Sequence, residues 1–259
     1  TMADKDFVEL ADLEEARDKV RWGRANKSRK IEQQERIATA YHEAGHAVVQ
    51  MLLKDSDPLH KVTIIPRGQA LGVTFSLPEK DRLGYGRKFC EATMRVLCGG
   101  RIAEERKTGD ITSGAGMDIK MVTRLARAMV LEWGMSPKLG FVNYAGEDTQ
   151  QSFLPDKDYS PETNHVIDEE IRRLSDEAFN DTVRLVSENW EKVVAVAEAL
   201  LRYETLTRDD VDRLMRGESL GRPTIADMLT AEANRPKPMA EPKPADSGPE
   251  LGGAMPSPA

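Results

Sequence analysis

Two histidines and a glutamate between residues 40 and 54 have the types and spacing for metal chemistry. The stretch reads His42-Glu43-Ala-Gly-His46, within apolar residues that recur at helical spacing. At roughly 100° per residue, His42 and His46 project about 40° apart and one turn along the same helix face, so both imidazoles reach one ion. Glu43 falls about 60° from His46, beside the ion, where a carboxylate takes a proton from metal-bound water. This is the arrangement found in zinc proteases.

A structural alternative exists, because the pattern fixes only three positions and coincidental matches are common. Histidines at this spacing also pack in cores or face solvent. The context favours a metal site: the helix has an apolar stripe with both histidines off it, and two of the chain's four histidines lie here. The stripe comprises Ile37, Tyr41, Ala44, Val48, and Met51 or Leu52.

A catalytic zinc needs three protein ligands and an open water position, so one place remains after the two histidines. An extended H-E-x-x-H-x-x-G-x-x-H site is excluded, because Val49 and Leu52 occupy its glycine and third histidine positions. Asp118 begins a helix after a loop of small residues and is a candidate ligand, with N-capping of that helix as the equal alternative. His60 and His165 are expected at the surface.

Composition limits the functional classes. The 259-residue chain has a net charge of −7 and no basic stripe interleaved with aromatics, which argues against nucleic-acid binding. No run of about 18 apolar residues is present, so we expect a soluble fragment. No G-x-x-x-x-G-K-[ST] loop occurs, and ATP binding by this chain is therefore not expected. Cys90 and Cys98 lie eight residues apart in one helical pattern, too far for a disulfide, and are expected as buried thiols.

The periodicities predict a mostly α fold with a small antiparallel β-sheet. Strands are predicted at residues 61–65 and 71–77, joined as a hairpin and closed by prolines. Gly99 and Gly100 interrupt a predicted helix at 84–106 and favour close packing against Gly45, with a kink or helix break as the alternative. The other predicted helices are 6–21, the helix carrying His42, the helix after Asp118, two apolar stripes between 160 and 201, and 207–215.

Six ordered motifs, within matches that run from about residue 10 to 217, resemble the peptidase domain of the FtsH family of AAA-type, membrane-anchored zinc proteases. They are Tyr41 to His46, Lys61 to Gly68, Leu71 to Phe75, Cys98 to Glu105, Thr112 to Ala115 with Asp118, and Trp133 to Ser136. The resemblance implies a zincin-like H-E-x-x-H helix with a C-terminal helical bundle. It also implies one Zn²⁺ per subunit, held by His42, His46 and Asp118, with Glu43 as the catalytic carboxylate.

The resemblance further makes Glu104 a candidate to orient a ligand histidine, while Met117 stands where the family often has asparagine. Residues 1–30 are expected to be the end of a preceding ATPase module and a linker, 31–217 the peptidase domain, and 218–259 a disordered proline-rich tail. The full-length parent would act as a homohexamer at the cytoplasmic side of the cell membrane. This chain would meet the membrane only through segments it lacks.

Two functions follow from these residues. The first is a zinc endopeptidase that cuts unfolded or membrane polypeptides without a covalent enzyme intermediate. Its substrate would lie extended along the strand edge at 71–77, with Gly72, Val73, Thr74 and Phe75 as the candidate contacts. The alternative is a non-catalytic, zinc-stabilised oligomerisation scaffold. Glu43 discriminates, because a structural zinc site usually has four protein ligands and needs no adjacent carboxylate.

Overall fold

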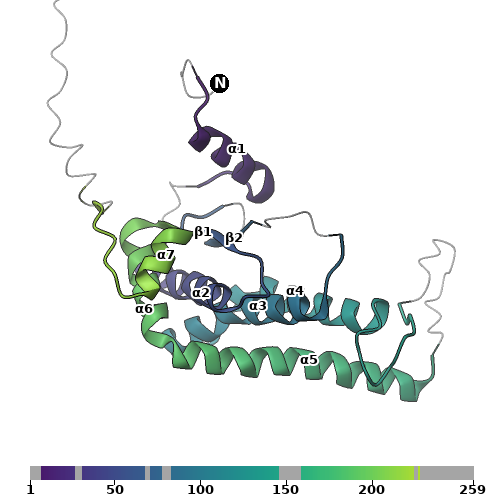
Figure 1. The fold of residues 1–259 in the computed structure, drawn as a ribbon. Helices are drawn as coiled ribbons and strands as arrows, with labels where there is room; N and C mark the ends of the chain where they lie inside the picture. The colour runs from purple at the N-terminus through teal and green to yellow at the C-terminus, as the bar shows by residue number, and fades with distance from the viewer. Residues whose placement is uncertain are drawn as a thin grey trace, which may run out of the picture.

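The computed structural model describes residues 7–26, 31–67, 71–77, 83–145, 159–224 and 227. Within them the chain is mostly helical with a small antiparallel sheet, as predicted (Figure 1). The helices are α1 (Leu10–Trp22), α2 (Gln33–Leu52), α3 (Arg87–Thr108), α4 (Gly116–Arg127), α5 (Pro161–Glu188), α6 (Trp190–Tyr203) and α7 (Arg208–Met215). A 3-10 helix η1 (Ser113–Ala115) precedes α4, and a π-helix η2 (Ala128–Glu132) follows it.

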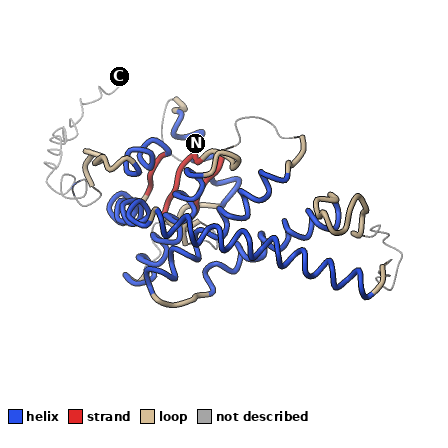
Figure 2. Tube along the Cα trace, turned by 60° about the horizontal axis from the view of Figure 1, so that its bottom comes forward, coloured by secondary structure: helices blue, strands red, loops and turns tan. Residues whose placement is uncertain are grey.

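The sheet contains β1 (Leu59–Thr63), β2 (Val73–Ser76) and β3 (Thr205–Thr207) in the order β2-β1-β3. All pairings are antiparallel, with Val62 opposite Thr74 on one side and Leu206 on the other. The predicted hairpin is confirmed, but the sequence missed β3, whose three residues are too short to show alternation. Figure 2 shows the three strands side by side next to the helices. Because β1 lies in the middle, β2 is an outer strand of the sheet that the described residues form.

Helix α2 lies at the centre of the fold, in contact with α3, α6 and the sheet. Gly45 of α2 meets Gly99 of α3: a Cβ on Gly45 would lie 2.7 Å from the Ala103 Cβ and still closer to the Gly99 carbonyl. The predicted close approach is therefore confirmed. The predicted one-sided burial of α2 is wrong, because residues 39–41 and 43–50 are all buried. The face of α2 that carries His42 and His46 packs against α3 and is not exposed to solvent.

The C-terminal half is built on α5, which is 28 residues long and thus about 42 Å. It begins with Pro161 in the first turn and the Ser160 hydroxyl accepting a hydrogen bond from the Thr163 amide. The buried Glu170 carboxylate accepts hydrogen bonds from Ser136 and Arg173. This network fixes the loop after η2 to α5.

Helix α1 contacts the sheet region through charged side chains. Its apolar residues Leu10, Leu13 and Val20 are exposed, and the contacts with the sheet region are ionic instead. Asp18 is buried and pairs with Lys61, while Glu15 pairs with Arg67 at 2.8 Å. No helix in the described part of the chain is long and apolar enough to span a bilayer. The tail predicted to be disordered lies outside the described residues from position 228 onwards.

Candidate metal centre

Three side chains from two helices converge on one point. His42 and His46 of α2 have their Nε2 atoms 3.0 Å apart, and Oδ2 of Asp118 lies 3.2 Å from the first and 3.4 Å from the second. One ligand atom from each residue lies within 4.8 Å of the others. Asp118 is the third residue of α4, whose N-cap is Ala115, so the capping alternative for Asp118 is wrong. Its carboxylate faces the histidines.

The other nitrogen of each imidazole is already engaged. Nδ1 of His46 donates to the Val96 carbonyl of α3 at 2.7 Å, and Nδ1 of His42 lies 2.9 Å from Oε2 of Glu104. Glu104 in turn accepts a hydrogen bond from the Thr112 hydroxyl at 2.6 Å. A partner on Nδ1 sets the ring orientation and leaves Nε2 for a metal. Both Nε2 atoms therefore point at the common centre.

The charges around this centre favour a cation. Burial alone would lower the pKa of His42, but hydrogen bonds to Asp118 and Glu104 raise it to about 10. Burial alone would raise the pKa of both carboxyl groups. Hydrogen bonds with the two histidines nevertheless hold the pKa of Asp118 below its usual range, and hydrogen bonds from His42 and Thr112 lower the pKa of Glu104. A divalent cation at the Nε2 atoms would replace the proton as the positive charge that these carboxylates stabilise.

Glu43 lies beside the centre without joining it. Its side chain is buried, and burial raises the pKa of the carboxyl although the neighbouring histidines oppose this. Thr74 of β2 donates to Oε2 of Glu43 at 2.7 Å. Gly72 faces the same carboxylate, since a Cβ there would lie 2.6 Å from Glu43 Cγ. A carboxyl with a raised pKa, next to a metal centre, is suited to accept and return a proton.

The space at the centre fits a small ion. A Cβ on Gly100 of α3 would lie 2.6 Å from Nε2 of His42 and closer still to Nε2 of His46. Glycine at position 100 therefore keeps α3 clear of the ligand nitrogens. Two imidazoles and one carboxylate form the donor set of a catalytic zinc, which leaves a fourth position open. The residues present fit this metal.

The candidate substrate strand borders Glu43. Gly72 to Phe75 run past the Glu43 carboxylate into β2, the edge strand of the sheet. The Phe75 side chain is buried in the core, so only its backbone lies at this edge. Val73 and Thr74 are half-buried.

The remaining candidate ligands are elsewhere. His60 lies within β1, is half-buried and approaches the Arg17 guanidinium at 2.9 Å, while His165 is exposed on α5. Cys90 is buried and Cys98 half-buried, and both are free thiols. The sequence did not reveal Thr74, Thr112 or the Val96 carbonyl as partners of the site. Apart from the general rule that metal-bound histidines need such partners, no sequence signal points to them.

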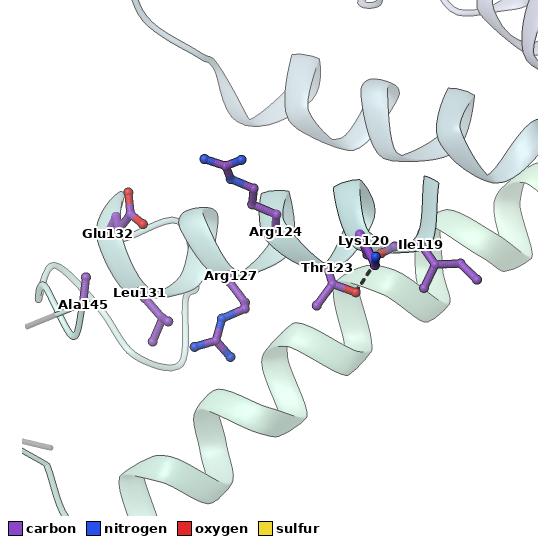
Figure 3. A pocket seen from close by; sticks show the side chains of 8 residues that line it. All are labelled: Ile119, Lys120, Thr123, Arg124, Arg127, Leu131, Glu132 and Ala145. Carbon is purple, nitrogen blue, oxygen red and sulfur yellow. Dashed lines mark hydrogen bonds between the residues drawn. The ribbon is translucent and has the colours of Figure 1, made fainter. Parts of the chain in front are cut away.

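A separate cavity of about 510 Å³ lies along α4 and η2 (Figure 3). It is lined by Ile119, Lys120, Thr123, Arg124, Arg127, Leu131, Glu132 and Ala145. At 100° per residue, Arg127 projects opposite Asp118 on the helix. The cavity therefore opens away from the metal centre and takes no part in it.

Comparison with known proteins agrees with this geometry. The model of peptidase family M41 matches residues 29–214. "ATP-dependent zinc metalloprotease FtsH 2" of Methylacidiphilum infernorum is 48% identical over 224 residues, which cover 85% of this chain and 35% of that protein. "ATP-dependent zinc metalloprotease FtsH 4" of Sorangium cellulosum is 47% identical over 84% of this chain and 34% of its own length. The chain thus spans about a third of these relatives, and it belongs to peptidase family M41.

Proposed function

We propose that this chain is the peptidase part of an FtsH-type protease and hydrolyses peptide bonds with one Zn²⁺ held by His42, His46 and Asp118. The observation that carries the proposal is the convergence of the three ligand atoms within 4.8 Å, beside the buried carboxylate of Glu43. A scaffold site would need no such carboxylate.

Each residue has a defined task in the reaction. When bound, zinc polarises the scissile carbonyl and lowers the pKa of water towards about 7. Glu43 accepts the proton of the attacking water and returns it to the leaving amine nitrogen, so no covalent enzyme intermediate forms. Glu104 and the Val96 carbonyl hold the two imidazoles in the orientation that points Nε2 at the metal.

The substrate is an extended polypeptide that pairs with the outer edge of β2. Backbone hydrogen bonds to an edge strand provide affinity without demanding particular side chains. The edge runs past Glu43, because Thr74 of β2 is bonded to that carboxylate. A chain held there lies next to the group that transfers the proton. We therefore expect unfolded polypeptides as substrates and weak sequence preference.

The wider activity belongs to a longer protein. The relatives are named ATP-dependent, whereas this sequence contains no G-x-x-x-x-G-K-[ST] phosphate loop. We place substrate unfolding, membrane attachment on the cytoplasmic side and assembly into a homohexamer in that longer protein.

The test compares the wild type with Glu43→Gln, which keeps the shape of the side chain and removes its basicity. Zinc content and cleavage of an unfolded protein are measured on both. We expect equal zinc content and the loss of most cleavage activity in the variant. Cleavage that persists unchanged in Glu43→Gln would contradict the catalytic assignment. Zinc without any cleavage in the wild type would favour the scaffold function.

A further inference from the structure

One face of the strand around β2 is fixed to α2 at three alternating positions. Gly72, Thr74 and Ser76 point to the same side, because side chains alternate along an extended strand. Gly72 lies against Glu43, the Thr74 hydroxyl donates to Oε2 of Glu43, and the Ser76 hydroxyl accepts from Nε2 of Gln50 at 2.8 Å. Glu43 and Gln50 are seven residues apart and thus share a face of α2.

The contact at Thr74 differs from the contact at Ser76 in what it restrains. Gln50 lies away from the metal ligands, so its hydrogen bond only attaches the strand to the helix. Glu43 carries the proton in the proposed reaction. A glutamate has three side-chain torsions, and burial alone does not choose among their rotamers. The hydrogen bond of 2.7 Å to Thr74 selects one position for the Glu43 carboxylate.

We propose that Thr74 is a positioning residue for the catalytic base. Its hydroxyl holds Oε2 of Glu43, so that the other oxygen, Oε1, exchanges the proton with the water and the leaving amine. The inference rests on the proposed function of Glu43. Because Thr74 also belongs to the edge strand, the same hydrogen bond fixes the base relative to the strand on which the substrate pairs.

The expected effect follows from the sensitivity of catalysis to geometry. A displacement of about 1 Å in a reacting group can cost about 100-fold in rate. Thr74→Val preserves the branched shape and removes the hydroxyl. We expect kcat to fall by about 10- to 100-fold on an unfolded substrate, with KM and zinc content unchanged. Thr74→Ser retains the hydroxyl and should recover most of the lost kcat.

A matched control is available on the neighbouring strand. The buried Thr63 of β1 donates to the Glu204 carbonyl at 3.0 Å, away from the metal centre. Thr63→Val therefore removes a threonine hydroxyl from the same sheet without touching Glu43. We expect this variant to keep the wild-type kcat even if its unfolding temperature drops. Equal losses of kcat in Thr63→Val and Thr74→Val would overturn the proposal, because they would indicate a general effect on the sheet.

A double-mutant cycle separates positioning from structure. If Thr74 acts through Glu43, Thr74→Val should cause no further loss in residual kcat on the Glu43→Gln background. A full additional loss in the double variant would contradict the proposal, as would wild-type kcat in Thr74→Val or an effect on KM alone. The proposed function fails separately, through wild-type cleavage by Glu43→Gln alone.

Discussion

Gly100→Ala places a methyl group directly against the two proposed histidine ligands of the metal. Gly100 lies in α3, and a Cβ there would come 2.6 Å from Nε2 and 2.7 Å from Cδ2 of His42, and nearer still to Nε2 of His46. These nitrogens are the atoms that face the centre. A single added carbon therefore tests whether this space holds zinc.

The size of the effect follows from contact distances. A carbon normally keeps about 3.5 Å from a neighbouring heavy atom, so the His42 ring would have to retreat by about 0.9 Å. Metal sites tolerate changes of about 0.2 Å in ligand distance. Altering only the partners of ligands costs about 10- to 100-fold in metal affinity, and displacing the ligands themselves should cost more. We expect zinc affinity to fall by at least about 100-fold in Gly100→Ala, with peptidase activity lost in parallel.

The metal-free protein should tolerate the change better. Alanine in a helix interior gains about 1 kcal/mol over glycine, whereas overpacking costs about 1–3 kcal/mol. The free energy of unfolding of the metal-free protein should thus fall by about 0–2 kcal/mol. Chelator competition gives the zinc affinity, and denaturant unfolding in the presence of chelator gives the stability.

Gly116→Ala is the matched control. Gly116 lies two residues before Asp118 at φ −61° and ψ −31°, with no other group within 4 Å of an added Cβ. This variant should bind zinc and cleave as the wild type does. Normal zinc affinity and activity in Gly100→Ala would refute the assignment of this space to the metal. Equal losses in both variants would show that the effect is not specific to the ligands.

Two further predictions concern a ligand and a buried carboxylate. Asp118→Ala should lose zinc and activity, because two histidines alone hold zinc weakly. Full zinc occupancy and activity in this variant would show that Asp118 is not the third ligand, and Glu104 would be the next residue to test. The hydrogen bond with Arg173 outweighs burial and lowers the pKa of Glu170 to about 2. The ionised carboxylate therefore contributes fully to stability above about pH 4.5, and this contribution is lost as the pH falls towards 2. The difference in unfolding free energy between wild type and Glu170→Gln should therefore shrink between pH 7 and pH 3 in urea titrations, and a constant difference would contradict this.

The sequence by itself determined the parts of the site that lie within one element. Helical periodicity sets the directions of His42, Glu43 and His46, because rotation per residue is a property of the helix. The small residues Gly45 and Gly99 likewise predicted a close approach of two helices, which the structure confirms. Fold class followed in the same way, from the lengths and periods of the apolar patterns.

Only the tertiary structure decided which elements meet. The carboxylate of Asp118 lies 76 residues from His42 in sequence and could equally have capped its own helix, yet packing of α4 places it 3.2 Å from Nε2 of His42. Thr74 reaches Glu43, and Gly100 leaves room for an ion, through the same kind of long-range contact. Packing also left the apolar stripe of α1 exposed and paired β3 with β1. Periodicity fixes angles within an element, whereas distances between elements depend on how all the buried surfaces fit together.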